Sequence, residues 1–92
     1  MGLEAAVAEI IASWDSGVLA RGEVVGRFVD LLTATNVAEV VAAVPAPWRV
    51  AFVDRLLAIG APGTLVYIGG VPSETFETDV RPAIRDWLLR QR

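Results

Sequence analysis

Apolar residues recur at the spacing of an α-helix in five stretches of this chain. In residues 3–15 they form one stripe when successive positions are placed about 100° apart around a helix axis. The stripe contains Leu3, Val7, Ile10, Ile11 and Trp14. Gly17 follows where a glycine in the left-handed conformation commonly ends a helix. The pattern therefore predicts a first helix over residues 3–15 that is closed by Gly17.

Two further helices are predicted over residues 22–33 and 37–44. The first of them has a wide apolar face with charged residues along the opposite edge. The second is short and rich in valine, a β-branched residue with low helix propensity, so tertiary packing must stabilise it. Asn36, with Glu39 three residues later, has the pattern of a capping box, which predicts a helix start at this point.

A fourth helix is predicted over residues 48–59. Pro47 suits the first turn of this helix, because the N–H group that proline lacks would have no partner there. The apolar arc of the stretch is broad, and only Asp54 and Arg55 clearly face water beyond the first turn. We therefore expect this helix to be central. The core is expected to contain Phe28, Leu32, Phe52 and Leu56.

Residues 60–75 form the one long break in the helical pattern, and glycine and proline punctuate it. Within the break, the run from Thr64 to Ile68 favours extended structure. A single strand needs a hydrogen-bonding partner, which no other part of the sequence supplies. Two interpretations remain open: a hydrophobic connection that covers the end of the bundle, or a recognition strand that contacts another chain. The candidate contact residues are Leu65, Val66, Tyr67 and Ile68.

The last helix is predicted to begin between Thr75 and Val80 and to continue to the C-terminus. Proline is tolerated in the first turn of a helix but not in its interior. Pro82 therefore makes Thr78 or Asp79 the expected N-terminal cap.

These stretches together predict a single all-α domain over residues 1–92. Its architecture is a compact bundle of four main helices plus one short helix, with an apolar extended connection before the C-terminal helix. A chain of 92 residues is long enough for one hydrophobic core and too short for two. The hydrophobic fraction of 54% is high for such a domain, which favours a partner or a second copy that covers surplus apolar surface.

The charge of the chain argues against a nucleic-acid-binding protein, because its net charge is −3 and such proteins are usually basic. A helix-turn-helix protein is also disfavoured, since the candidate recognition helix over residues 48–59 is nearly all apolar. The charge is unevenly distributed. Residues 1–48 hold six acidic residues and two arginines, a net −4, whereas residues 49–92 hold five acidic residues and six arginines, a net +1.

Most catalytic chemistry is excluded, because the chain has neither histidine nor cysteine. It lacks an imidazole base, a thiolate nucleophile and a nitrogen or sulfur ligand for a transition metal. The glycines around residues 60–70 lack the lysine and the spacing of a phosphate-binding loop. We therefore expect no catalytic residue, no cofactor and no metal dependence.

Acidic residues at the start of the last helix are a candidate binding site. Glu74, Glu77 and Asp79 form the only acidic cluster that is close in sequence, and it suits a basic protein partner or Ca²⁺. The cluster lacks the ligand order of a calcium-binding loop. Acidic residues at a helix N-terminus are also favoured by the helix dipole, so a solvated surface is the competing interpretation.

Basic residues of the same helix form a second candidate. Arg81 and Arg85, together with Arg92, lie on one side of the helix beside its apolar face. They suit the recognition of acidic groups on a partner. The competing interpretation is a set of surface ion pairs, because three arginines in an acidic protein make a weak basic patch.

The function that this sequence favours is that of a small acidic intracellular protein-binding module: an adaptor, a regulator, or an antitoxin-like or immunity-like inhibitor. The alternative is a structural or assembly subunit that forms a homo-oligomer through its surplus apolar surface. No apolar run of about 18 residues is present, so we expect no membrane span. The N-terminus lacks the pattern of a secretory signal, and we expect a cytoplasmic location.

Overall fold

The computed structural model describes residues 2–65 and 73–91, and every regular element in these ranges is helical. The elements are α1 (Leu3–Asp15), α2 (Arg21–Asp30), α3 (Val37–Ala43), α4 (Ala46–Gly60), the π-helical turn η1 (Phe76–Val80) and α5 (Arg81–Arg90). The predicted all-α bundle of four main helices and one short helix is confirmed. The predicted extended connection continues past Leu65 into residues that lie outside the described ranges.

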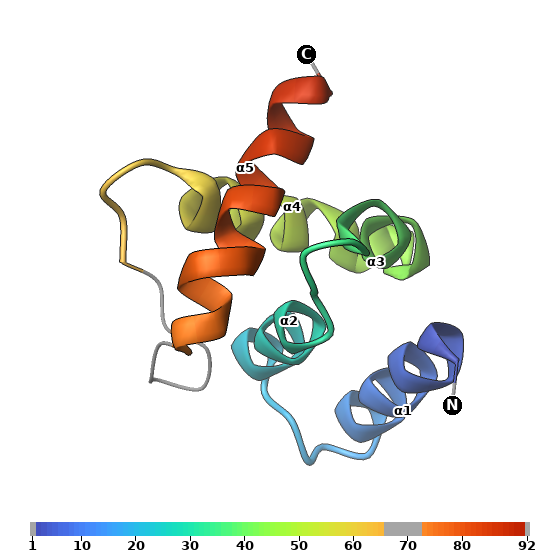
Figure 1. Ribbon diagram of the computed structural model, residues 1–92. Helices are drawn as coiled ribbons and strands as arrows, with labels where there is room; N and C mark the ends of the chain where they lie inside the picture. The colour runs from blue at the N-terminus through green and yellow to red at the C-terminus, as the bar shows by residue number, and fades with distance from the viewer. Residues whose placement is uncertain (1, 66–72, 92) are drawn as a thin grey trace.

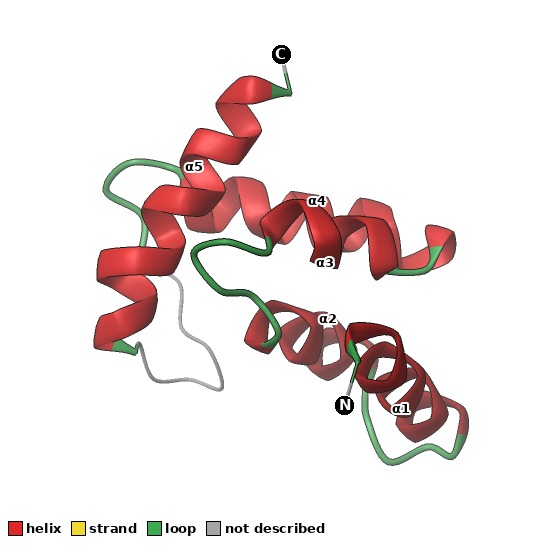
Figure 2. Cartoon of the chain, turned by 45° about the vertical axis from the view of Figure 1, so that its right-hand side comes forward, coloured by secondary structure: helices red, strands yellow, loops and turns green. Residues whose placement is uncertain are grey.

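The helices pack as two pairs that meet at α4. Helices α1 and α2 lie side by side, α2 packs against α4, and α5 crosses α4 (Figures 1 and 2). The short helix α3 contacts α1, α4 and α5, and so closes the bundle. The C-terminal turns of α5 extend beyond the other helices in both views.

The core forms where these helices converge. The four residues predicted for it, Phe28, Leu32, Phe52 and Leu56, are all buried. Ile84 of α5 and Phe76 of η1 complete the core on the side of the last helical segment. Phe76 lies between the long break and the predicted cap of the last helix, so its place in the core was not predicted.

A chain of aromatic contacts joins α1, α2 and α4. The ring centroids of Trp14 and Trp48 are 5.2 Å apart, those of Trp48 and Phe28 are 6.4 Å apart, and those of Phe28 and Phe52 are 6.1 Å apart. All three pairs have the edge-to-face geometry that aromatic quadrupoles favour. The Arg21 guanidinium lies 5.6 Å from the centre of the Trp48 ring and covers its outer face.

The sequence predicted the end of α1 correctly but misassigned the role of Asn36 after α2. Gly17 has a φ of 80°, which confirms that it ends α1 in the left-handed conformation. The predicted capping box at Asn36 is wrong. Its amide side chain turns back instead, because it accepts a hydrogen bond from the Thr33 N–H at 2.6 Å and donates one to the Leu31 carbonyl at 2.9 Å. Asn36 therefore closes the end of α2, where carbonyl groups lack helical partners.

Helix α4 begins at Ala46, two residues before the predicted start, and Pro47 lies in its first turn as expected. The expectation that only Asp54 and Arg55 face water is wrong. Val50 is 73% exposed and Leu57 is 53% exposed, whereas Arg55 is partly buried. The reason is that α2 and α5 cover different parts of α4 and leave one of its apolar stripes uncovered.

The last helical segment begins at Glu74, so the predicted cap at Thr78 or Asp79 is wrong. The residues before Pro82 form the π-helical turn η1, in which the Arg81 N–H reaches the Phe76 carbonyl five residues back. A proline inside a regular α-helix clashes with the carbonyl four residues earlier. The wider turn makes room for the ring, so the helix passes through Pro82 instead of starting there.

Candidate functional site

A large groove lies between the C-terminal ends of α4 and α5. Its volume is about 630 Å³. Most of its lining is apolar, and it comprises Leu57, Gly60, Ala61, Pro62, Arg85, Leu88, Leu89 and Gln91. The described residues of this lining come only from α4, α5 and the residues that directly follow each of them.

A glycine sets the distance between the two helices at the groove. A Cβ atom at position 60 would lie 3.1 Å from Leu88 Cδ1 and 3.5 Å from the Arg85 Cα. Contacts below about 3.4 Å force the neighbouring atoms to shift, so only glycine permits this close crossing without adjustment. The backbones of α4 and α5 are therefore in near contact at the inner edge of the groove.

Arg81 also joins the last helical segment to the end of α4. Its Nε donates a hydrogen bond to the Ile59 carbonyl at 2.6 Å, and its Nη2 donates one to the Ala61 carbonyl at 2.8 Å. Its Nη1 forms an ion pair with Glu77 Oε2 at 2.9 Å. The guanidinium thus satisfies carbonyl groups at the end of α4 that have no helical partners.

This arrangement changes the interpretation of two predicted binding residues. Arg81 and Glu77 are occupied with each other and with the end of α4, which gives them a structural role that sequence spacing did not reveal. Their predicted contact with a partner stays a prediction. The other residues of the acidic cluster, Glu74 and Asp79, are exposed and do not line the groove.

Two leucines give the groove its exposed apolar surface. Leu57 of α4 is 53% exposed and Leu89 of α5 is 52% exposed. Single exposed leucines are ordinary on protein surfaces, but these two come from different helices and line one groove. The sequence analysis did not identify Leu89 as a candidate binding residue. Its position among the charged residues of the last helix, away from the predicted apolar face, could have indicated an exposed apolar side chain.

Arg85 is the only charged residue among those that the structure describes in the lining of this groove. It is exposed, and within the described part of the chain it makes no hydrogen bond and no ion pair. The carboxylates of Asp54 and Asp86 lie on the same two helices but outside the lining. The predicted basic stripe is therefore divided: Arg81 acts inside the fold, and Arg85 faces the groove.

The predicted recognition strand is only partly described. Leu65 is 68% exposed and does not line the groove. Val66, Tyr67 and Ile68 lie outside the described residues, so both interpretations of this segment stay open.

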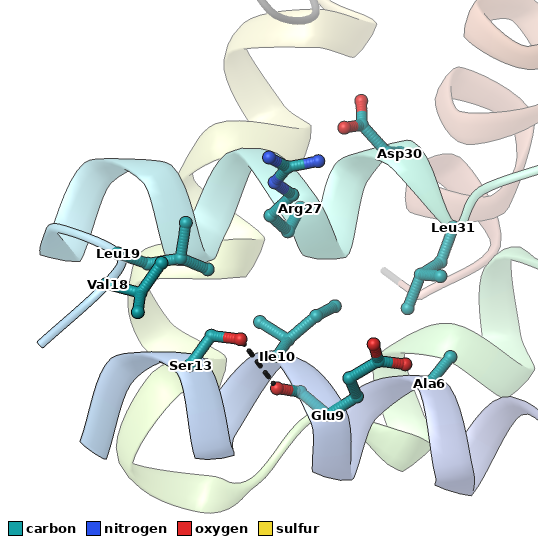
Figure 3. A pocket seen from close by; sticks show the side chains of 9 residues that line it. All are labelled: Ala6, Glu9, Ile10, Ser13, Val18, Leu19, Arg27, Asp30 and Leu31. Carbon is teal, nitrogen blue, oxygen red and sulfur yellow. Dashed lines mark hydrogen bonds between the residues drawn. The ribbon is translucent and has the colours of Figure 1, made fainter. Parts of the chain in front are cut away.

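A second groove of about 440 Å³ lies between α1 and α2 (Figure 3). Its floor is apolar, with Ile10 between the two helices, and its rim is charged. The Glu9 side chain rises from α1 toward α2, while Arg27 and Asp30 project from α2. Among the described residues, no ion pair joins these three groups.

The electrostatics of the second groove are dominated by Asp30. Partial burial raises the pKa of the Asp30 carboxyl above its usual value, and the nearby charge of Arg27 opposes this shift without cancelling it. The groove therefore holds an exposed carboxylate whose charged form is somewhat disfavoured, although this carboxylate and the Arg27 guanidinium on a neighbouring turn do not make a catalytic pair. Within residues 2–65 and 73–91, no three carboxylates gather as they would around a metal ion.

Comparison of the chain with models of protein families, with curated protein sequences and with solved structures found no match. The function is therefore argued from the geometry of the grooves. No helix in the described part of the chain has both the length and the apolar character needed to cross a membrane.

Proposed function

We propose that this protein is a small protein-binding module without catalytic activity of its own, which acts in the cytoplasm. Its docking site is the groove between α4 and α5, and the occupant is an apolar segment of another protein. The observation that carries the proposal is that Leu57 and Leu89, each about half exposed, converge on one apolar groove from two helices.

The geometry suits binding because the groove is formed before a partner arrives. The close crossing at Gly60 and the two bonds from Arg81 to the Ile59 and Ala61 carbonyls join the end of α4 to the last helical segment, and neither involves the side chain of Leu57 or Leu89. Burying a leucine side chain completely contributes about 1.5–3 kcal/mol, so covering the exposed halves of both contributes roughly 2 kcal/mol. Little of this is lost to reorganisation, because a rigid site does not need to be ordered on binding.

The experiment begins by identifying the partner. A photoreactive amino acid at position 89 in the native host cross-links proteins that occupy the groove, and the captured protein is then purified. Calorimetry measures its affinity for the wild-type protein and for a double variant, Leu57→Ser with Leu89→Ser. We expect the double variant to bind at least tenfold more weakly, which corresponds to about 1.4 kcal/mol.

The matched control is Val50→Ser. Val50 is 73% exposed and lies two turns before Leu57 on α4, outside the groove lining. We expect this control to bind like the wild type, and all variants to melt close to it. Equal binding by the double variant and the wild type would show that the groove is not the docking site.

A homo-oligomeric assembly subunit is the second candidate, and one observation favours it. Val50 and Leu57 are seven residues apart on α4, so the exposed apolar stripe continues beyond the groove. Light scattering at low micromolar concentration distinguishes the two candidates. A stable oligomer that Val50→Ser dissociates supports the assembly subunit, whereas a monomer supports the binding module.

A further inference from the structure

The secondary structure around the groove limits how a partner can bind. Recognition by strand addition needs an open sheet edge, and the described residues contain only helices. Recognition of a polyproline helix needs an aromatic-lined groove, and none of the described residues that line this groove is aromatic. A groove between two helices with leucines on both walls is instead typical of sites that receive the apolar face of an amphipathic helix.

The charge of the groove adds a second requirement. Among the described residues of the lining, Arg85 is the only charged one, and the adjoining hollow beside Gly60 and Pro62 adds only Arg81. The described residues of both linings include no aspartate or glutamate. An occupant that brings a cation would meet like charge, whereas an occupant that brings a carboxylate would complete an ion pair with Arg85.

We infer that the groove receives an amphipathic helix of another protein, whose apolar side chains contact Leu57 and Leu89 and whose carboxylate pairs with the Arg85 guanidinium. This inference rests on the proposed function and names the class of partner. Arg85 and Leu89 are four residues apart on α5, a rise of roughly 6 Å. The carboxylate of the partner helix therefore lies about one turn from its apolar anchor.

A second copy of this chain fits the groove less well. Two identical grooves facing each other would bring Arg85 of one copy toward a lining whose described residues include no aspartate or glutamate. A symmetric contact needs a surface that is complementary to itself, and the described part of the lining has only one sign of charge. The charge of the groove thus favours a different protein with acidic residues beside an apolar face.

Selection from a displayed library of helical peptides tests this inference on the whole protein. The library places apolar residues at three fixed positions of one face and varies the flanking positions. On the wild-type protein we expect enrichment of Asp or Glu about one turn from an apolar residue. On the Arg85→Glu variant we expect the enriched residue to change to Lys or Arg at the same position.

Arg90→Glu is the matched control. It makes the same charge change on an exposed arginine of α5, five residues further on and outside the groove lining. We expect it to keep the preference for acidic peptides. A synthetic copy of the enriched peptide should bind the milder variant Arg85→Gln about tenfold more weakly than the wild type. Raising the salt concentration should weaken the wild-type complex more than the variant complex.

The outcomes separate this inference from the proposed function. Enriched peptides that need Leu57 and Leu89 but show no acidic preference would overturn the inference and leave the docking groove in place. Enrichment that survives the double leucine variant, or no enrichment on the wild type, would overturn both. A wild-type dimer in sedimentation that the double leucine variant dissociates would assign the groove to a second copy and overturn the inference.

Discussion

The two grooves of this protein lie between helix pairs that are held together by different means. At the α1–α2 groove the apolar side chains Ile10, Leu19 and Leu31 are partly buried between the helices and hold the pair together. At the α4–α5 groove the backbones meet at Gly60 and Arg81 ties the end of α4 to the last helix. The polar clamp and the close backbone contact add to the buried core, which includes Ile59 of α4 and Ile84 of α5.

This difference determines which surface each groove offers. At the α1–α2 groove, the apolar side chains are partly buried against each other, so the charged residues at the rim form the surface that a partner can contact. Where glycine and an internal guanidinium hold the helices, neighbouring leucines remain partly exposed. In a small domain, apolar side chains can therefore stay exposed for binding at a place where other contacts already hold the two helices together.

The largest effect on this comparison is expected from removing the clamp. Arg81→Met keeps an unbranched side chain but leaves the carbonyls of Ile59 and Ala61 without the guanidinium donors. Hydrogen bonds to charged groups contribute about 1.5–3 kcal/mol each, so we expect a loss of at least about 2 kcal/mol in unfolding free energy. Chemical denaturation measures it. Hydrogen exchange should increase first at the end of α4 and in α5, before α1 and α2.

Glu77→Gln separates the ion pair from the clamp. It removes the carboxylate that pairs with Arg81 Nη1 but leaves both bonds to carbonyl oxygens. A partly exposed ion pair between neighbouring turns contributes less than about 1 kcal/mol. If Glu77→Gln destabilises the protein as much as Arg81→Met does, the carbonyl bonds are not the source of stability at this end.

A pair of glycine substitutions is expected to give a smaller effect on stability, one that differs between α2 and the α4–α5 crossing. A Cβ atom at Gly26 of α2 meets nothing within 4 Å, whereas a Cβ atom at Gly60 meets Leu88 at 3.1 Å. Alanine is favoured over glycine in a helix interior by about 1 kcal/mol. We therefore expect Gly26→Ala to raise the melting temperature and Gly60→Ala to lower it or leave it unchanged. Equal stabilisation by both would show that the α4–α5 crossing is not tight.

The sequence predicted the helices well and the groove poorly, for reasons that particular residues make clear. Helical periodicity identified the buried faces because residues such as Phe28 and Phe52 pack against several neighbours at once. Asn36 could not be predicted from spacing, since its side chain can serve the helix before it as well as the one after it. The partners of Arg81 lie 20 and 22 residues away in the chain, beyond the reach of any local pattern.

The start of the last helix was predicted wrongly from Pro82, because it too depends on contacts with the assembled core. Proline usually starts a helix, but a π-helical turn before it lets the segment continue, and only the burial of Phe76 and Val80 in the assembled core favours that turn. The groove itself depends on where α4 and α5 cross, which is a property of the whole bundle. Of its lining, the sequence singled out Arg85 alone.

The smallest expected effect concerns Asp30 at the α1–α2 groove. Burial raises the pKa of its carboxyl above the usual value, so the folded state binds the proton more tightly than the unfolded state does. Ionising Asp30 therefore opposes folding at pH 7, and this cost disappears as the pH falls through the pKa of the folded state. Asp30→Asn should be slightly more stable than the wild type at pH 7, and the difference should vanish near pH 3, below the usual carboxyl pKa of about 3.9.

Asp15→Asn is the control, because Asp15 ends α1 as Asp30 ends α2 but does not line this groove. Thermal melts of both variants across this pH range measure the effect, and an equal gain from the two variants would assign it to the helix dipole instead of to the groove.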